Sequence, residues 1–287
     1  MLRLAVATDA ETYERIQDPL GERGIAVDAV AIAERTLPLT DAPPEFDDFD
    51  AGFVYPPRIM EGGVADALLD VPWVNDREAI LTSRNKADVI ARLDRAGVPV
   101  PETVAVSNPV DRAELVAAFE RFDPPVVVKP NSATRGVGVA KAADLDSFLG
   151  IADYLDLVHD YRATGDQSFL LQEYLPDARD YRVMLVDGEY VGAVERRLPA
   201  DAIEAGQWKH NVHRGAEAVG VDLPAELREL AERAAAALDI PWLGVDLLVT
   251  DDRAVVTETN ARPTVDSATK YEPGFFDDLA ALIRGAV

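Results

Sequence analysis

Two carboxylates and an amide near the end of the chain have the types and spacing of metal ligands. Asp246 lies in the run Leu-Gly-Val-Asp-Leu-Leu-Val, and Glu258 and Asn260 lie in Val-Val-Thr-Glu-Thr-Asn. Both runs are typical of β-strands, and residues 250–253 between them are turn formers, so a hairpin is predicted. If its loop centres on Asp252, Asp246 lies opposite Glu258, and Asn260 points to the same face because side chains alternate. Facing carboxylates repel unless a cation lies between them, so the pattern predicts a hard cation such as Mg²⁺ with positions left for phosphate oxygens.

A hairpin that is merely acidic is the competing interpretation. The chain carries 52 aspartate and glutamate residues, so a chance pairing of Asp with Glu-x-Asn is easy to obtain. The rest of the chain decides between a metal-nucleotide site and an acidic surface.

The charge of the whole chain restricts its partners. Its 287 residues carry a formal net charge of −24, and a field of this sign repels nucleic acid and anionic membranes as general partners. The acidity is spread along the sequence, and only five of its 28 basic residues are lysines. This composition resembles that of halophilic proteins, whose carboxylate repulsion is screened over about 3 Å at 1 M salt.

Features that the sequence lacks narrow its chemistry and location. There is no cysteine, which excludes disulfides, thiolate metal sites and a cysteine nucleophile. The apolar run at residues 1–7 is too short for a signal peptide, and no stretch approaches the roughly 18 apolar residues of a membrane span. We expect a cytoplasmic protein with neither a nucleic-acid nor a membrane partner.

Short apolar runs predict a small α/β unit at the start of the chain, because runs at residues 2–7, 26–32 and 51–55 alternate with helix-compatible segments. One helix from Arg77 to Arg95 is expected to follow, closed by Gly97. A lid of strands and helices is expected next, with a strand near Val104, a helix from Asp111, a strand at Val126–Lys129, a glycine-bearing loop, and a helix from Asp144 to about His159.

Closely spaced strands are expected after residue 166, at Phe169–Leu175, Tyr181–Val186 and Tyr190–Arg197. A helix from Pro224 to Leu238 precedes the hairpin, and Pro273 opens a terminal helix. The predicted fold class is α/β, with α+β lobes around a mostly antiparallel catalytic sheet. We expect three domains, an N-terminal α/β domain (1–80), a central lid domain (81–168) and a C-terminal catalytic domain (169–287).

Lysine is rare in this chain, so the lysines that it keeps indicate function. Lys86 lies on a predicted helix, and Lys129 ends an apolar strand that would not bury an ammonium without a partner. A compact ammonium suits phosphate oxygens. The loop after Lys129 contains Gly136 and Gly138, whose backbone freedom could expose N–H groups to phosphates. A glycine-rich β-turn is the alternative interpretation of this loop.

Polar and cationic groups gather at further places along the chain. Gln172-Glu-Tyr-Leu175, at the end of an apolar strand, could offer backbone groups to an adenine edge, with Asp180 for ribose hydroxyls; a solvated strand end is the alternative. Cationic groups that suit phosphoryl or carboxylate oxygens follow in Asp180-Tyr-Arg182, Glu195-Arg-Arg197 and Asn211-Val-His-Arg214.

In this order, these residues resemble the ATP-grasp superfamily and most closely its RimK-type branch of glutamate and amino-acid ligases. The likeness covers about residues 75–285, and the ordered combination is far more specific than any one motif. It implies an ATP-grasp fold preceded by a small Rossmann-like α/β domain. With this agreement, the metal-nucleotide interpretation outweighs the acidic hairpin.

The resemblance implies a role for each matching residue. For ATP it implies Lys86 and Lys129 on the phosphates, Ser132, Arg135, Gly136 and Gly138 in the lid loop, Gln172, Glu173, Tyr174 and Leu175 in the adenine hinge, and Asp180 on the ribose. For Mg²⁺, with Mn²⁺ as an alternative, it implies Asp246, Glu258 and Asn260. For substrate oxygens and developing negative charge we expect Arg182, Arg196, Asn211, Arg214 and Arg262.

The expected function is an ATP-dependent carboxylate–amine ligase that works through an acyl phosphate. Its expected substrates are a small carboxylate and an amine, which include an amino acid or a peptide or protein terminus; self-association is left open.

Two departures from the family keep alternatives open, Asn85-Lys86 in place of Asp-Lys and Asn260-Ala-Arg-Pro-Thr264 without a glycine after the proline. Arg262 favours a carboxylase-like or purine-type enzyme that uses carboxyphosphate, and a non-catalytic Mg-ATP-binding regulator is the other alternative.

Overall fold

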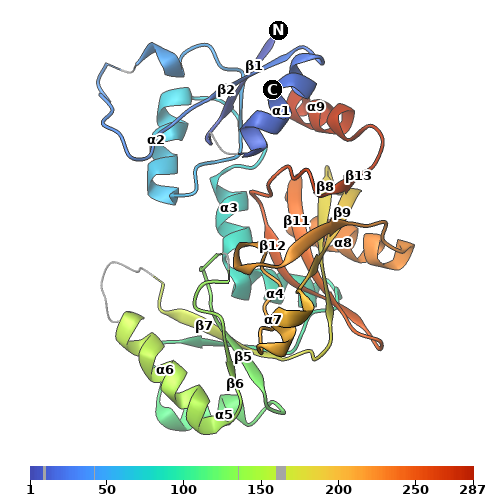
Figure 1. Ribbon diagram of the computed structural model, residues 1–287. Coiled ribbons are helices and arrows are strands. Elements are labelled where there is room, and N and C mark those ends of the chain that lie inside the picture. Colours follow the sequence, from blue (N-terminus) through green and yellow to red (C-terminus); the bar gives the residue numbers. More distant parts are fainter. Residues whose placement is uncertain (9–10, 42, 135, 160–165) are drawn as a thin grey trace.

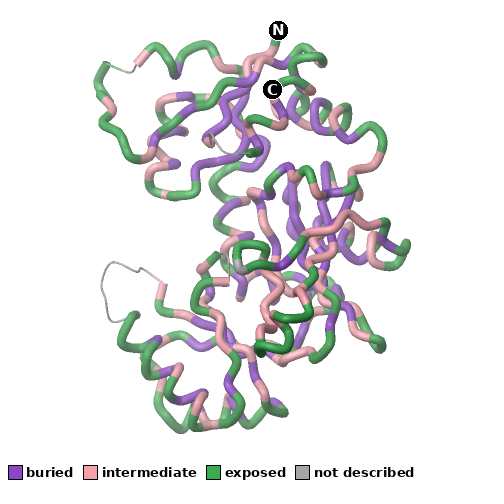
Figure 2. Tube along the Cα trace, in the orientation of Figure 1, coloured by how far each residue is buried: buried purple, intermediate pink, exposed green. Residues whose placement is uncertain are grey.

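Three sheets follow one another along the molecule (Figure 1). The computed structural model describes residues 1–287 except 9–10, 42, 135 and 160–165. The N-terminal sheet and both chain ends lie at the top of the view, the largest sheet lies in the middle, and a third sheet lies at the bottom (Figure 1). Buried segments, purple in Figure 2, run along the strands of the upper and middle sheets. The predicted α/β class is confirmed.

The N-terminal unit is a parallel sheet in the order β2-β1-β3. Its elements are β1 (Leu2–Val6), α1 (Glu11–Gly21), β2 (Ile25–Ala29), the 3-10 turn η1 (Pro44–Phe46), β3 (Ala51–Phe53) and α2 (Ile59–Leu69). The last helix, α9 (Phe275–Gly285), returns to pack beside α1. Trp242 joins this unit to the middle sheet, because its ring lies 6.1 Å from that of Phe53 and 6.2 Å from that of Phe275.

The single helix predicted over residues 77–95 is wrong, since the segment forms two helices that meet at Asn85. They are α3 (Arg77–Arg84) and α4 (Lys86–Arg95). Asn85 has an extended backbone, and its Oδ1 accepts hydrogen bonds from the N–H of Asp88 at 3.1 Å and from Nδ2 of Asn131 at 3.0 Å. An asparagine side chain that caps a new helix competes with helix continuation. Lys86 therefore occupies the first turn of α4.

The lower sheet has the order β4-β7-β5-β6. Its elements are β4 (Thr103–Ser107), α5 (Arg112–Phe119), β5 (Val126–Pro130), β6 (Ala140–Ala142), α6 (Leu145–His159) and β7 (Ser168–Glu173). Helices α5 and α6 pack together below the strands in Figure 1, around buried Phe119 and Phe148. By strand pairing, β7 belongs to this sheet, although a domain boundary was predicted at residue 168; the division into three domains stays a prediction.

The middle sheet is antiparallel, as predicted, in the order β10-β9-β8-β11-β12, with β13 beside β9. Its elements are β8 (Arg179–Val186), β9 (Glu189–Arg197), α7 (Ala200–Glu204), the 3-10 turn η2 (Val212–Arg214), β10 (Glu217–Gly220), α8 (Ala225–Leu238), β11 (Trp242–Val249), β12 (Ala254–Asn260) and β13 (Lys270–Tyr271). Helices α4 and α8 bury apolar side chains against one of its faces. The described part of the chain has no helix that is long and apolar enough to cross a membrane.

Buried side chains before α4 fix the end of the β11–β12 hairpin. Asn75 donates from Nδ2 to the carbonyls of Trp242 and Ala261, each at 2.6 Å. The hydroxyl of Ser83 lies 3.1 Å from that of Thr259 and accepts from the N–H of Ala261 at 3.0 Å. Because buried polar groups are costly to leave unpaired, these bonds hold the hairpin in one position against α3.

Asp246 and Glu258 are direct partners across β11 and β12, as the sequence predicted, but the turn is not the only cause. Val249 pairs with Ala254, so the turn is centred just before Asp252. That turn alone would leave the two carboxylates out of register by one residue. The register shifts next to Asp246, and this bulge supplies the extra residue.

Thr257 is the extra residue of the bulge. Its hydroxyl donates to the carbonyl of Asp246 at 3.3 Å, and its own carbonyl accepts from Nζ of Lys129 at 3.3 Å. A bulge turns a backbone group out of the strand ladder. Here that group reaches a lysine of the neighbouring sheet.

Candidate active site

A row of charged side chains crosses the middle sheet where it meets the lower sheet. Arg182 on β8, Asp246 on β11 and Glu258 on β12 are successive Cα partners, so their side chains share one face. The sequence argument placed a cation between the two carboxylates. In the structure, each carboxylate instead contacts cations on its outer side. We call the groups around Asp246 the arginine flank and those around Glu258 the lysine flank.

Asp246 accepts from two guanidinium groups in the arginine flank. Arg182 donates from Nε to Oδ1 at 2.7 Å and from Nη2 to Oδ2 at 2.8 Å, and Nη2 of Arg196 lies 3.0 Å from Oδ2. Burial alone would raise the pKa of the Asp246 carboxyl, but Arg182 and Arg196 outweigh it and hold this pKa below its ordinary value. Asp246 is therefore an ionised, buried carboxylate.

Arg196 also binds Asp180, so the arginine flank is a network of two carboxylates and two guanidinium groups. Nε of Arg196 donates to Oδ1 of Asp180 at 2.8 Å, and Nδ1 of His210 lies 3.7 Å from Oδ2. Burial raises the pKa of the Asp180 carboxyl, and Arg196 offsets this only in part. The predicted contact of Asp180 with a ribose stays a prediction.

Two buried lysines from different elements meet in the lysine flank. Nζ of Lys86 lies 3.3 Å from Oε1 of Glu258 and donates to the carbonyls of Asn131 and Ala133. Nζ of Lys129 donates to Oε1 of Gln172 at 2.9 Å. Burial, aided by the charge of Lys86 and opposed by Glu258 and Asp246, lowers the pKa of Lys129 to about 8.

The predicted lid loop contacts Lys86 through its backbone carbonyls and packs against Asn211, before β10. Gly136 and Gly138 have φ values of +66° and +75°, a conformation that other residues rarely adopt. A Cβ at Gly136 would lie 2.4 Å from Oδ1 of Asn211, and one at Gly138 would lie 2.7 Å from the Pro130 ring. Both glycines are thus required where the loop folds back, and Gly136 touches the predicted catalytic Asn211.

The predicted adenine hinge has its side chains engaged in the protein. Gln172 is buried, and its Nε2 donates to the hydroxyl of Thr103 at 2.9 Å. Glu173 accepts from the N–H of Glu102 at 2.8 Å and from Nη2 of Arg253 at 2.5 Å. The backbones of Gln172 and Glu173 are paired within the lower sheet as well, and Tyr174 and Leu175 follow the end of β7.

Sequence reasoning missed a cluster of cations and aromatic rings beside the hinge. Nζ of Lys141 lies 4.5 Å from the ring centroid of Tyr174 and 5.3 Å from that of Trp208. The two rings meet edge to face, and Nζ of Lys209 lies 5.5 Å from the Trp208 ring and donates to the carbonyl of Val139. Four of the five lysines therefore lie around this site. The scarcity of lysine, which pointed to Lys86 and Lys129, could also have pointed to Lys141 and Lys209.

The remaining predicted residues have different outcomes. Ser132 is exposed and Leu175 is half-buried. The backbone N–H of Arg262 donates to Oδ1 of Asn260 at 2.9 Å, so the backbone of Arg262 lies beside a predicted metal ligand. Arg135 and the side chain of Arg214 lie outside the described residues.

The donor set Asp246, Glu258 and Asn260 fits a hard divalent cation in its chemistry. It offers two carboxylates and an amide oxygen on one face of neighbouring strands. Oδ1 of Asp246 and Oδ1 of Asn260 each accept one hydrogen bond, which leaves a second lone pair on each for a metal, whereas Oδ2 of Asp246 already contacts both Arg182 and Arg196. No group of three or more His, Cys, Asp or Glu side chains poised for a metal occurs among the described residues, so an amide must complete this set.

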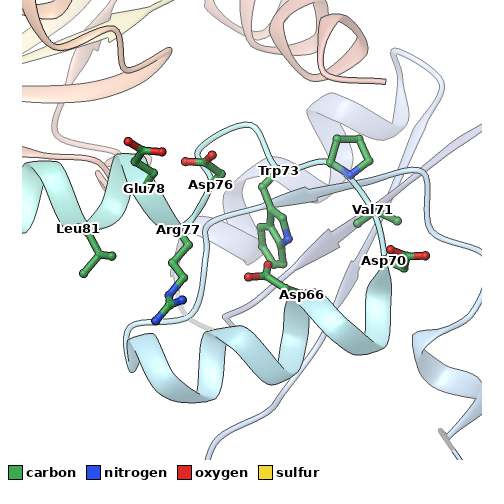
Figure 3. Close-up of a pocket in the computed structure, with 9 residues that line it drawn as sticks. Asp66, Asp70, Val71, Trp73, Asp76, Arg77, Glu78 and Leu81 are labelled. Carbon is green, nitrogen blue, oxygen red and sulfur yellow. The ribbon is translucent and has the colours of Figure 1, made fainter.

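A separate hollow of about 1060 Å³ lies between α2 and α3 (Figure 3). Asp66, Asp70, Asp76 and Glu78 line it together with Trp73, and the predicted site residues that the structure describes do not. Its acidity opposes the binding of phosphate or carboxylate groups. The chemistry predicted from the sequence therefore belongs to the two flanks and not to this hollow.

Comparison with known proteins identifies the class. Residues 83–275 match the family model of the RimK-like ATP-grasp domain, and the chain belongs to this family. A RimK domain ATP-grasp protein from Sphaerobacter thermophilus superposes with a TM-score of 0.70 at 23% identity, covering 99% of each chain. The D-alanine–D-alanine ligase of Bacillus anthracis, complexed with ATP, gives 0.68 at 15% identity, covering 100% of this chain and 97% of that one. These structures confirm the predicted ATP-grasp fold.

Curated relatives carry more particular names. A probable alpha-L-glutamate ligase of Enterobacter sp. (strain 638) is 31% identical over 206 residues, covering 69% of this chain and 62% of the relative. A ribosomal protein bS6–L-glutamate ligase of Escherichia coli O139:H28 is 30% identical over the same length and with the same coverage. The match thus spans 62% of the length of these relatives. The resemblance to the RimK-type branch is confirmed.

Proposed function

We propose that this chain is an ATP-dependent carboxylate–amine ligase. The observation that carries the proposal is the lysine flank, in which Lys86 and Lys129 meet beside Glu258 beneath the glycine loop. Burying two ammonium groups beside each other is unfavourable, so their convergence calls for a strongly anionic ligand. A nucleotide triphosphate has that charge, and the relatives named as ligases and a structural neighbour complexed with ATP support this choice.

Within this proposal, ATP lies between the middle and lower sheets. Lys86, Lys129 and the N–H groups of the loop around Gly136 and Gly138 bind its phosphates, and the hinge at Gln172–Leu175 faces its base. Asp246, Glu258 and Asn260 hold Mg²⁺, or Mn²⁺, which neutralises charge on the phosphates. Phosphoryl transfer depends mainly on positioning and charge neutralisation, so no side-chain nucleophile is needed.

The arginines supply the binding of the second substrate. A substrate carboxylate attacks the terminal phosphate of ATP to give an acyl phosphate and ADP, and the amine then displaces inorganic phosphate and loses a proton to form the amide. Arg182, Arg214 and Arg262 bind the carboxylate or the developing negative charge, since a guanidinium fork matches carboxylate and phosphoryl oxygens, while Arg196 stays on Asp180 and Asp246 and adds positive charge beside them. The names of the relatives put L-glutamate first among the amines to test, with a small molecule or a peptide or protein terminus as the acceptor.

An ADP-release assay tests the proposal. Purified protein is mixed with Mg-ATP, pooled carboxylic acids and pooled amines that include L-glutamate. The assay is run in high KCl, because the acidic composition of the chain is typical of proteins that work in high salt. We expect ADP release that needs both pools. Release that needs bicarbonate alone would favour the carboxylase-like alternative. Tight Mg-ATP binding without any release would contradict the ligase and favour a non-catalytic regulator.

A further inference from the structure

Arg182 holds the oxygen atoms of Asp246 that a metal ion would need. Its Nε and Nη2 bind Oδ1 and Oδ2 as a fork, at 2.7 and 2.8 Å. The side chain of Asp246 is 8% exposed, so water screens this contact weakly. A divalent cation that approaches Asp246 therefore meets a guanidinium in its path.

The two arginines of the flank differ in how easily they can leave. Arg196 is 10% exposed and binds Asp180 as well as Asp246. Arg182 is 30% exposed and, among the described residues, donates to Asp246 alone. Moving Arg196 would strip a buried Asp180 of its partner, whereas Arg182 can turn towards solvent. A cation that competes for Asp246 should thus displace Arg182 and leave Arg196 in place.

Electrostatics favour bound Arg182 when the metal is absent and released Arg182 when the metal is present. Without a metal, Arg182 and Lys86 keep Asp246 and Glu258 neutralised from their outer sides. With a divalent cation bound, Arg182 would stand next to a like charge in a poorly screened site. The released guanidinium fork has just lost a carboxylate and is suited to bind another.

We propose that Arg182 binds Asp246 only until the metal site fills, and that it is then released to bind the carboxylate of the substrate. This inference rests on the proposed function for its metal and its carboxylate substrate. It implies an order of binding in which the carboxylate site forms only after the metal has bound. Arg182 thus contacts the substrate itself and couples the metal site to the carboxylate site.

The Nε–H groups of the two arginines report the exchange directly by ¹⁵N NMR of arginine-labelled protein. Arg182→Lys and Arg196→Lys variants identify the two signals. In protein with ADP and EDTA, both signals should be protected from exchange with water. Excess Mg²⁺ should remove the protection of Arg182 and leave that of Arg196, and acetate should then shift the Arg182 signal only when Mg²⁺ is present. An Arg182 signal that stays protected in excess Mg²⁺ would overturn the inference.

Metal affinity provides the second measurement. Titration of Mn²⁺, followed by electron paramagnetic resonance without nucleotide, should give about tenfold tighter binding for Arg182→Gln than for the wild type, because the competing fork is gone. Arg197→Gln is the matched control, since Arg197 is 54% exposed on the neighbouring strand and pairs with Glu195; its affinity should stay within about twofold of the wild type.

Arg182→Lys separates displacement from a general effect of charge. It keeps the positive charge but lacks the fork, so it should also bind Mn²⁺ more tightly than the wild type. Wild-type affinity in Arg182→Lys, or equal affinity in Arg182→Gln and Arg197→Gln, would contradict displacement. Substrate-dependent ADP release by the wild type would still support the ligase in that case, so the two proposals fail separately.

Discussion

The two flanks of the β11–β12 hairpin neutralise their carboxylates in different ways. In the arginine flank, planar guanidinium groups hold Asp246 at 2.7–3.0 Å, and its pKa is lowered. In the lysine flank, Lys86 approaches Glu258 only to 3.3 Å, and burial lowers the pKa of Lys129 to about 8. Arginine keeps its charge under burial and binds through a fork, whereas lysine is a point charge whose pKa is easily shifted.

This difference indicates a division of labour. The arginine flank is satisfied without a ligand and contributes to the fold, because its buried charges are paired with one another. The lysine flank has more ammonium charge than its single half-buried carboxylate balances, so a phosphate ligand completes it. Mutations that remove one charge at a time can test this division.

The largest expected difference is between Asp246→Asn and Glu258→Gln. Each removes a proposed metal ligand, so each should lower Mg-ATP turnover on the order of 10³-fold. Only Asp246→Asn breaks a buried ion-pair network, and it should also lower the free energy of unfolding by about 3 kcal/mol. ADP release and denaturant unfolding measure the two effects.

Asp222→Asn serves as the control, because Asp222 pairs with Lys270 at the surface and should matter little for either quantity. Equal losses of stability in Asp246→Asn and Glu258→Gln would break the comparison between the flanks. Wild-type turnover in Glu258→Gln would show that the metal site is assigned wrongly.

The second prediction concerns Arg262, an arginine outside the arginine flank, and its contribution to the rate of ligation. Arg262 follows Asn260 closely, and a guanidinium there can bind acyl-phosphate oxygens or the substrate carboxylate in a way that lysine cannot reproduce. Arg262→Lys should lower ligation by about 10²-fold, comparable with loss of one preorganised donor, and leave ATP affinity nearly unchanged.

Nucleotide titration and ADP release separate these outcomes, with Arg58→Lys as the control, because Arg58 is exposed and pairs with Glu61 in the N-terminal unit. Parallel losses of ATP affinity and turnover would place Arg262 on the nucleotide instead. No change in either quantity would make Arg262 a surface cation without a role in the reaction.

The pattern of the sequence predicted most of the elements, because short apolar runs and turn residues act locally. The N-terminal α/β unit and the antiparallel sheet are confirmed, and so is the opposition of Asp246 and Glu258. The break at Asn85 was missed because the apolar pattern continues through it, and only contacts with Asn131 and Asp88 favour the cap.

Side-chain partners could not be predicted in the same way. That Arg182 and Arg196 bind Asp246 follows from the pairing of β8 with β11, which no local pattern specifies. The bulge at Thr257 likewise depends on contacts with the other sheet. Lys141 reaches Trp208 and its neighbour Lys209 from a distant segment, and the rarity of lysine in the sequence could not show that these residues meet.

The third prediction concerns the pH dependence of the lysine flank. Since the pKa of Lys129 is lowered to about 8 in the fold and is about 10.4 in the unfolded chain, the unfolded state binds more protons between these values. Stability therefore rises with pH in this window and is lost as pH falls through about 8. Relative to Lys129→Met, the wild type should gain about 1.5 kcal/mol between pH 8 and pH 9.5.

Denaturant unfolding at several pH values measures this gain, and Lys270→Met is the control because Lys270 is exposed and pairs with Asp222. Lys270→Met should keep the rise of the wild type. An identical pH profile in Lys129→Met would mean that Lys129 is not the group that titrates, and the contrast between a shifted lysine and a fixed arginine would lose its support.

The smallest expected effect separates the buried flanks from the acidic surface. With 52 acidic residues against 28 basic ones, exposed carboxylates repel one another, and salt screens exposed charges much more than buried ones. The melting temperature of the wild type should rise by a few degrees when KCl goes from about 0.1 M to well above 1 M. The melting temperature of Asp246→Asn should start lower and rise by the same amount, because the ion pair that the substitution breaks is buried.

A flat or falling melting temperature of the wild type would contradict the high-salt interpretation and leave the proposed ligase function untouched. A steeper rise in Asp246→Asn would show that the arginine flank is more open to solvent and ions than its burial indicates.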